Sequence, residues 1–157
     1  DEDGVDTSMA QQALTAIDEA DAERTLRHPV TAIGPDGGVP VFAQHAPHPR
    51  EYGTLARVLG RYVRERAVLT LEEAVRKRRG ATAQRLGLQD RGVLREGLFA
   101  DIAVFDPATS QDRATFVEPH QYAEGVEYVL VNGTLVVDGG RHTGARPGRV
   151  LYGPGQR

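Results

Sequence analysis

The strongest hydrophobic pattern in the chain lies between Gly53 and Arg66. Apolar residues recur there at the spacing i, i+3, i+4, i+7 and i+8, and charged residues occupy many of the positions between them. The apolar positions are Leu55, Val58, Leu59, Tyr62 and Val63. Because this spacing puts them on one face, the segment is predicted to form an amphipathic α-helix that packs on a core.

Three more helices are predicted by the signals at their ends. Residues 18–27 carry acids in the first turn and arginines in the last, which suits the helix dipole. A capping box, in which Thr70 caps the helix and Glu73 reaches back, opens a helix over residues 70–79. A short helix over residues 81–86 is expected to stop at a glycine. All of these helices are interpreted as structural.

A short apolar run from Val30 to Ile33 follows the first helix and is predicted to be a buried β-strand. A helix that leads directly into such a β-branched strand is typical of an α/β fold. The strand runs into the sequence Gly-Pro-Asp-Gly-Gly, whose carboxylate is that of Asp36. This carboxylate could bond to its own backbone, as in an ordinary turn, or it could be presented by an open loop for catalysis. The residues alone leave both interpretations open.

The last part of the chain, residues 88 to 152, is rich in glycine and valine and is predicted to form a small antiparallel layer. Short strands are expected at residues 102–105, 128–131 and 135–137. The dipeptide Asn132-Gly133 between the last two strands favours positive φ at both positions. These two strands are therefore predicted to form a hairpin.

Composition narrows the classes of function. The 157 residues suffice for one domain with a core. The net charge is -3 and charges of both signs are interspersed, which argues against nucleic acid as a partner. The basic run from Arg76 to Arg79 is interpreted as a solvated helix end, with Arg78 on or near the packing face. Without cysteine the chain can form neither a disulfide nor a cysteine zinc site. No membrane span or signal segment is recognisable, so no membrane association is expected and the default location is cytoplasmic.

The histidines offer a weaker hypothesis. His45 and His48 lie three residues apart in a proline-rich loop and could bind a metal ion, which would make the chain a small metal-binding protein. Pro47, however, breaks the helix that would put both on one face, so surface histidines are the preferred interpretation. His120 and His142 stand alone and are likewise interpreted as surface residues.

Five stretches between about residues 18 and 151 follow one another in a distinctive order. They are DEADAERTLRHPVTAIGPDGG, HPREYGTLARVLGRYVRE, LTLEEAVRK, RLGLQDRGVLREGLFADIAVFDP and EYVLVNGTLVVDGGRHTGARPGRVL. As a set, they resemble the C-terminal part of the N-acyl-D-amino-acid deacylases (D-aminoacylases), which belong to the metal-dependent amidohydrolase superfamily. The resemblance implies a hydrolase of the amide C–N bond.

The resemblance also implies a fold. In that family a TIM-type barrel carries the active site, and a small β-sandwich is built from both ends of the chain. A whole barrel takes about 250 residues, so the resemblance implies an α/β fragment. Residues 1–17 would be a loose lead-in, and residues 18–87 the C-terminal end of the barrel, with Val30 to Gly34 as its last strand and the helices that follow. Residues 88–157 would be the small antiparallel β-sandwich portion.

By the same resemblance Asp36 is the catalytic aspartate at the end of the last barrel strand. In the family this carboxylate lies beside a zinc-bound water, accepts its proton and passes it to the departing amine. Asp36 would at most be one metal ligand, and His48 and Arg50, close to it in sequence, are candidates for substrate binding. The other metal ligands of the family come from earlier strands that this chain lacks. The resemblance therefore implies that the chain alone binds no catalytic zinc and hydrolyses nothing.

Two hypotheses of different class follow. In the first, the chain is the C-terminal portion of a zinc-dependent hydrolase of N-acyl-D-amino acids, and the missing N-terminal barrel region completes it. In the second, the chain is a non-catalytic remnant or an interaction module that pairs with another chain. Either way Ile33, Leu55 and Leu59 are expected to be partly exposed in a monomer, so self-association is expected.

Overall fold

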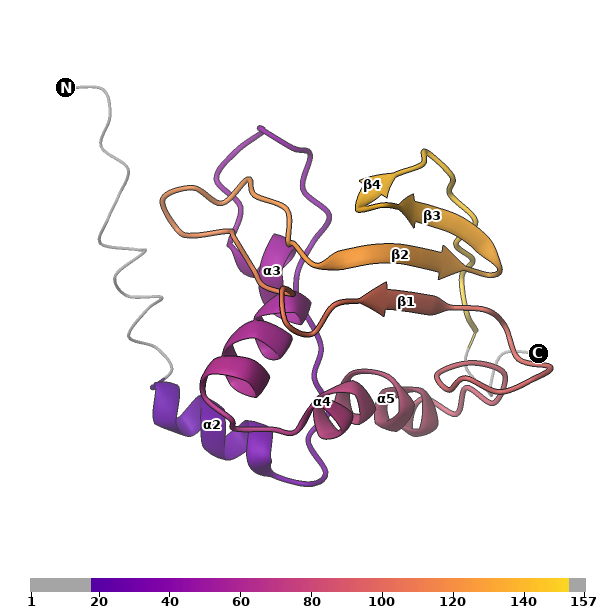
Figure 1. Ribbon diagram of the computed structural model, residues 1–157, viewed down its shortest axis with the longest axis horizontal. Helices are drawn as coiled ribbons and strands as arrows, with labels where there is room; N and C mark the ends of the chain where they lie inside the picture. Colours follow the sequence, from indigo (N-terminus) through magenta and orange to yellow (C-terminus); the bar gives the residue numbers. More distant parts are fainter. Residues whose placement is uncertain (1–17, 153–157) are drawn as a thin grey trace. The chain divides into compact units, whose positions relative to one another are not determined.

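The computed structural model describes residues 18–152, within two compact units, residues 1–31 and residues 32–157 (Figure 1). The lead-in expected at residues 1–17 lies outside the described residues. The first unit contains helix α2, Glu19–Arg27, which confirms the helix predicted there. Its N-cap is Asp18, whose carboxylate accepts a hydrogen bond from the backbone N–H of Ala20 at 3.3 Å.

The strand predicted from Val30 to Ile33 is absent, and this prediction is wrong. The segment carries no strand pairing, and Val30 is 83% exposed. In the second unit, the backbone N–H of Ile33 donates to the carbonyl of Lys77 at 3.1 Å, a contact with a helix end and not with a strand. A strand requires a neighbouring strand to satisfy its backbone groups. The described residues provide no such neighbour at this position, so no strand forms there.

The long amphipathic helix is present with a different geometry. It begins as α3, Arg50–Arg57, and continues as the π-helix η1, Val58–Glu65. The backbone N–H of Arg66 donates to the carbonyl of Arg61 at 2.9 Å, which is the i to i−5 spacing of a π-helix. Leu55, in α3, is 41% exposed, whereas Leu59, in η1, is buried. Leu55 and Ile33 are thus partly exposed as expected, and the expectation for Leu59 is wrong.

Glycines on this helix allow a loop to approach it closely. A β-carbon on Gly60 would lie 2.9 Å from the carbonyl oxygen of Ser110, and one on Gly53 would lie 2.7 Å from the β-carbon of Asp112. Ser110 also lies close to Gly125. A β-carbon on Gly125 would lie 2.5 Å from the backbone nitrogen of Ser110. The buried face of α3 and η1 therefore includes small residues that a search for large apolar side chains does not detect.

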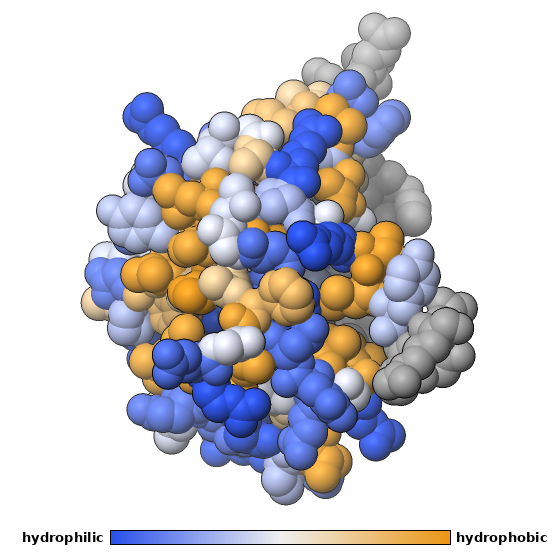
Figure 2. All heavy atoms as spheres, turned by 90° about the vertical axis from the view of Figure 1, so that its right-hand side faces the viewer, coloured by the Kyte–Doolittle hydropathy of each residue, from blue (hydrophilic) through white to orange (hydrophobic). Residues whose placement is uncertain are grey.

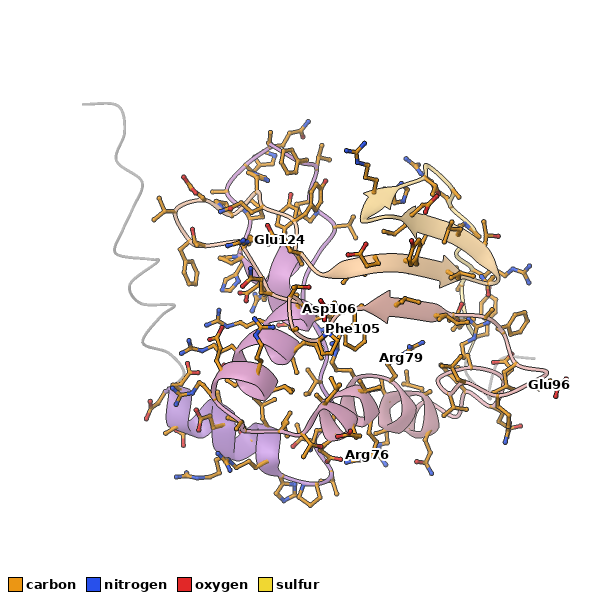
Figure 3. The ribbon with its side chains drawn as sticks, in the orientation of Figure 1. Arg76, Arg79, Glu96, Phe105, Asp106 and Glu124 are labelled. Atoms are coloured by element: carbon orange, nitrogen blue, oxygen red, sulfur yellow. The ribbon has the colours of Figure 1, made fainter. Side chains whose placement is uncertain are left out.

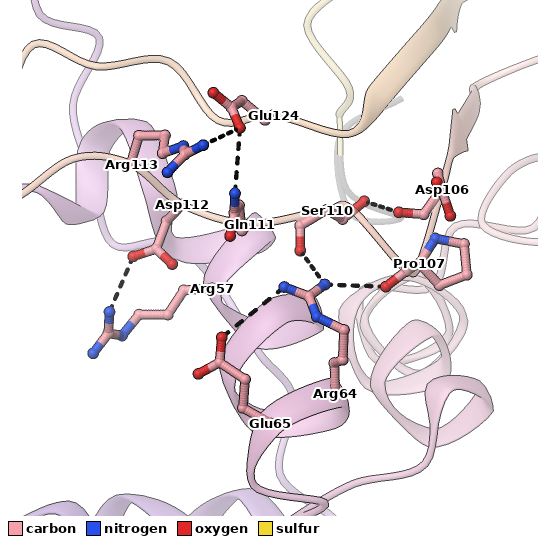
Figure 4. Close-up of polar contacts among 10 residues, drawn as sticks. All are labelled: Arg57, Arg64, Glu65, Asp106, Pro107, Ser110, Gln111, Asp112, Arg113 and Glu124. Atoms are coloured by element: carbon pink, nitrogen blue, oxygen red, sulfur yellow. Dashed lines mark hydrogen bonds and ion pairs between the residues drawn. The ribbon is translucent and has the colours of Figure 1, made fainter.

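Polar contacts fix the same loop to the helix (Figure 4). Ser110 is fully buried, and its hydroxyl donates to the carbonyl of Asp106 at 2.7 Å. The Arg64 guanidinium donates to the carbonyl oxygens of Ser110, at 2.8 Å, and of Pro107, at 3.1 Å. Ion pairs flank this contact, from Arg57 to Asp112 at 3.0 Å and from Arg113 to Glu124 at 2.7 Å.

Two short helices follow, α4 at Leu71–Arg78 and α5 at Gly80–Arg85, as predicted. The hydroxyl of Thr70 caps α4 by accepting from the backbone N–H of Glu73 at 3.2 Å. Glu73 does not reach back to complete the capping box. Its carboxylate instead accepts two hydrogen bonds of 2.8 Å from Arg76, because a guanidinium one turn away offers a charged donor.

The basic run at the end of α4 is not a solvated helix end, and that interpretation is wrong. Lys77 is 0% exposed and forms an ion pair with Glu73 at 3.7 Å. The Arg79 guanidinium donates to the carbonyl of Asp101, and Figure 3 shows Arg79 on the side of the helices that faces β1 (Ile102–Phe105), with Arg76 on the opposite side. Arg78 is half-buried, as expected, and burial together with the neighbouring Arg79 lowers its pKa. A carboxylate and a backbone carbonyl thus bind two of these cations, Lys77 and Arg79, within the protein.

The C-terminal part forms a four-stranded antiparallel sheet with the order β1-β2-β3-β4 (Figure 1). After β1 come β2 at Val126–Val131, β3 at Thr134–Asp138 and β4 at Arg141–His142. Asn132 and Gly133 have φ values of 47° and 79°, so the hairpin turn predicted between β2 and β3 is confirmed. The short strand β4 was not predicted. The described residues form this one sheet, without the second layer of a sandwich.

Few apolar side chains within residues 18–152 are buried. They are Ala56, Val58, Leu59, Val68, Leu69, Ala74, Ala83, Ala114 and Val136, most of them from the helical part. Large apolar side chains remain exposed on both the loops and the sheet, including the cross-strand neighbours Val104 and Tyr128, which are 47% and 43% exposed. No helix within residues 18–152 combines the length and the apolar character needed to cross a membrane.

The contact between Gly60 and Ser110 can be tested by substitution. We expect Gly60→Ala to lower the free energy of unfolding by about 1–3 kcal/mol, because the new methyl group overlaps a backbone oxygen that cannot move away alone. The matched control is Gly80→Ala in α5, where the nearest atom would lie 3.8 Å away, and which we expect to be neutral or stabilising by about 0.5 kcal/mol. Denaturant unfolding measures both, and equal effects would contradict the close approach.

Candidate functional site

Asp36 lies at the surface beside the first turn of α3. Its side chain is 92% exposed, and its carboxylate oxygen is 3.6 Å from a guanidinium nitrogen of Arg50. Its φ of 46° is in the left-handed region, which aspartate adopts more readily than most residues. The next residue, Gly37, packs so closely on α3 that a β-carbon would lie 3.1 Å from the α-carbon of Glu51. The turn therefore presents the carboxylate outward from a supported backbone.

His48 supports the start of the same helix. Its Nδ1 accepts a hydrogen bond from the backbone N–H of Arg50 at 3.0 Å, and its ring meets the ring of Phe116 edge-on at 4.9 Å. Burial first, and then the charge of Arg50, lower the pKa of His48, with Glu51 acting weakly in the opposite direction. The three candidates Asp36, His48 and Arg50 therefore come together at one end of α3.

An aromatic cluster adjoins this end of the helix, and sequence reasoning missed it. It consists of Phe42, Tyr52, His120 and Tyr122, with Phe42 and Tyr122 stacked at 5.2 Å between ring centres. The Tyr52 hydroxyl is 2.9 Å from Nδ1 of His120. Burial, followed by Tyr122 and Glu51, raises the pKa of Tyr52, so the phenol keeps its proton near neutral pH. The members of this aromatic cluster lie up to 80 residues apart in sequence, so no local sequence pattern could have revealed the cluster.

His120 is not an isolated surface residue, and that interpretation is wrong. Its Nδ1 accepts from the backbone N–H of Ala43 at 3.3 Å, and its Nε2 is 2.9 Å from the carbonyl oxygen of His45. His142, by contrast, is exposed, and its ring accepts only from the backbone N–H of Gly144 among the described contacts, at 2.9 Å.

The donors present here do not form a catalytic zinc site on their own. Within residues 18–152 no group of three or more histidine, aspartate or glutamate side chains is close enough to hold a metal ion. His45 takes part in the His120 contact through its carbonyl, and His48 uses Nδ1 to accept from a backbone amide. A catalytic zinc takes about three protein ligands, so the carboxylate of Asp36 cannot form such a site by itself.

A separate groove lies between α4, α5 and the loop after them. It is lined mostly by apolar atoms and by small residues such as Gly80, Ala83 and Gly87, together with the cations Arg76 and Arg91. Both cations are engaged by acids, Arg76 by Glu73 and Arg91 by Asp101. None of the residues that line it is an aspartate, a glutamate or a histidine, so this groove offers no acid or base for proton transfer.

Comparison with known proteins identifies the family. Residues 5–137 match the model of the amidohydrolase family, so the chain belongs to that family. Among its relatives is N-acyl-D-aspartate deacylase of Alcaligenes xylosoxydans xylosoxydans, 48% identical over 135 residues, which cover 86% of this chain and 26% of the relative. D-aminoacylase of the same organism is also 48% identical, over 86% of this chain and 27% of the relative. The resemblance recognised in the sequence is thereby confirmed.

Solved structures agree with these matches. A crystal structure of D-aminoacylase superimposes with a TM-score of 0.75 at 44% identity, over 82% of this chain and 27% of that one. N-acyl-D-glutamate deacylase from Bordetella bronchiseptica, complexed with zinc and a phosphonate inhibitor, superimposes with a TM-score of 0.71 at 47% identity, over 76% and 25%. The chain therefore has the α/β fold of a part of these enzymes and spans about a quarter of their length.

The lowered pKa of His48 can be measured directly. We expect its ring signals to titrate in the folded chain with a midpoint below the ordinary histidine value of 6.5, and to return toward that value in the denatured chain. Since the unfolded state then binds more protons, stability contributed through His48 is present above the unfolded pKa and is lost as the pH falls. Proton NMR titration with His48→Gln for assignment tests this, and a midpoint above 6.5 would contradict it.

Proposed function

We propose that this chain is the C-terminal portion of a zinc-dependent amidohydrolase that cleaves the amide C–N bond of N-acyl-D-amino acids, and that it is inactive alone. The observation that carries the proposal is the family match over residues 5–137, together with an exposed carboxylate at Asp36. Relatives named N-acyl-D-aspartate deacylase, D-aminoacylase and N-acyl-D-glutamate deacylase support the substrate class.

The proposal assigns the second unit to two parts of a larger enzyme. Helices α3 to α5 with η1 would be the last helices of a TIM-type barrel, and the sheet would be one portion of a small β-sandwich. The run before Asp36 would become the last barrel strand when neighbouring strands are present, because a strand forms only where a neighbour satisfies its backbone groups.

The chemistry assigned to this chain is a proton transfer. The carboxylate of Asp36 would accept a proton from the attacking water and return it to the departing amine nitrogen, which requires it to lie within hydrogen-bond reach of both. Arg50, 3.6 Å from Asp36, would bind the carboxylate of the substrate, and His48 would hold the backbone of Arg50 in place. Any zinc would be held mainly by residues outside this chain, as Asp36 alone does not fit a zinc site.

The partner implied by this proposal is the remaining part of the barrel. Figure 2 shows one face of the chain, on which apolar side chains lie scattered among charged ones. Exposed apolar residues on the sheet and loops include Val39, Leu94, Val104, Val117 and Tyr128. Of these, Val104 and Tyr128 are neighbours on adjacent strands, and exposed apolar residues that lie together favour association. The same observation supports the second candidate function, a module that pairs with another chain.

Association of the chain can be measured by sedimentation velocity. We expect the wild-type chain to associate as its concentration rises, because Val104 and Tyr128 form an exposed apolar pair on neighbouring strands. The double variant Val104→Thr, Tyr128→Thr keeps residues that favour strands and should associate at least about threefold more weakly. A wild-type chain that stays monomeric at every concentration would contradict the exposed interface.

The catalytic assignment is tested by supplying the missing part. We expect no turnover by the chain alone, and release of free D-aspartate from N-acyl-D-aspartate when it is combined with the part of the Alcaligenes N-acyl-D-aspartate deacylase that it does not match. Asp36→Asn should lower kcat in this complex by at least about a hundredfold, because an amide cannot accept and return the proton.

The matched control is Asp138→Asn, which alters an exposed aspartate at the end of β3 and should leave kcat unchanged. A soluble complex without activity, or equal activity of the two variants, would overturn the proposal. Stoichiometric zinc with turnover in the isolated chain would overturn the claim that it is inactive alone.

A further inference from the structure

The imidazole of His120 joins three segments at the N-terminal end of α3. Its partners are the backbone N–H of Ala43, the carbonyl of His45 and the hydroxyl of Tyr52, at 3.3, 2.9 and 2.9 Å. We call these four groups the His120 clamp. Figure 1 shows the loops that carry Ala43 and His120 side by side near the start of α3. The clamp therefore ties the loop after Asp36 both to a helix and to the segment that precedes β2.

The bonding partners define the state of the ring. The N–H of Ala43 can only donate, so Nδ1 of His120 must accept and carries no proton. The carbonyl of His45 can only accept, so the proton lies on Nε2. Tyr52 then donates its hydroxyl proton to Nδ1 as well and shares the single lone pair of that nitrogen with the N–H of Ala43, which agrees with its protonated phenol. Every polar position of the neutral ring has a partner in this arrangement.

The two residues that the clamp holds have unfavourable backbone conformations. Ala43 and His45 have φ values of 61° and 59°, where a β-carbon is crowded by the backbone. Such conformations persist only where the surroundings impose them. Together with Asp36, they make up three of the five non-glycine residues with positive φ in the described part of the chain. The loop that follows Asp36 is thus held in a shape that it would not adopt unaided.

The clamp is one of three attachments of this loop. The loop begins at Asp36 and Gly37, which contact Arg50 and Glu51 in the first turn of α3, and it ends at His48. The ring of His48 rests on Phe116, four residues before His120. Two of the three attachments thus depend on residues 116–120, which come from the β portion and not from the helical part.

We propose that His120, as the neutral Nε2–H tautomer, is a positioning residue that fixes the Asp36 carboxylate through the loop between them. The proposal rests on the proposed function, since it assigns a role toward the reaction of Asp36. The proposal gives the β portion a role in catalysis, because this portion holds the loop that follows Asp36. His120 itself contacts no reacting atom in this account.

Three substitutions separate the parts of the clamp. His120→Asn keeps an acceptor where Nδ1 lies and loses the donor to His45, whereas His120→Gln keeps a donor where Nε2 lies and loses the acceptor for Ala43. His120→Phe keeps the ring packing and loses all three hydrogen bonds, to Ala43, His45 and Tyr52. The matched control is His142→Phe, because His142 is exposed and lies outside the clamp.

In the isolated chain the readouts are NMR signals. We expect His120→Phe and His120→Gln to accelerate hydrogen exchange of the Ala43 amide by at least about tenfold, whereas His120→Asn and His142→Phe leave it nearly unchanged. The Asp36 carboxyl carbon should shift in His120→Phe, and the nitrogen signals of the wild-type ring should show protonation at Nε2. Unchanged exchange at Ala43, or an unchanged Asp36 signal in His120→Phe, would overturn the proposal.

In the reconstituted complex we expect His120→Phe to lower kcat by at least about tenfold with little change in KM, and His120→Asn to recover most of the loss. An active wild-type complex whose kcat survives His120→Phe would overturn the positioning role. A wild-type complex without activity would overturn the proposed function instead, and the Asp36 signal in the isolated chain would then decide whether His120 positions this carboxylate.

Discussion

The second unit depends on the close seating of Ser110 between two glycines. Ser110 is fully buried, and its carbonyl accepts from Arg64 at 2.8 Å. A β-carbon on Gly60 or on Gly125 would collide with the backbone of Ser110. Backbone contacts at this range tolerate little displacement, because protein interiors are close-packed. The helices and the sheet are therefore joined by a rigid crossing, and the segment that carries His120 begins just beyond it.

Local signals explain which elements the sequence could predict. Helix α4 follows from the cap at Thr70, and the hairpin follows from Asn132 and Gly133, since each signal lies inside the element it forms. The strand before Asp36 could not form from its own pattern, because strand pairing needs a neighbour. The place of His120 was equally hidden: its bond to Ala43 spans 77 residues, and nothing near either residue in sequence indicates it.

For the candidate site, family resemblance singled out Asp36, and the geometry adds what surrounds it. The ion pair with Arg50 is long, at 3.6 Å, and largely exposed, and such pairs contribute about 0–1 kcal/mol. Under the proposed function, a pair this weak would exchange partners when the carboxylate of a substrate binds. The arrangement is therefore compatible with the proposal that Arg50 binds substrate while Asp36 remains available for proton transfer. A strong, buried ion pair would not be compatible with these two roles.

The distance in sequence between the clamp and its loop also bears on the order of folding. Helix and hairpin contacts are local and can form early, whereas a contact across 77 residues must first close a large loop of chain. During synthesis from the N-terminus, the segment around Asp36 emerges long before His120 does. Asp36 would thus be synthesised early but fixed in position late. In a nascent chain its carboxylate would be held in place only after the segment with His120 had left the ribosome.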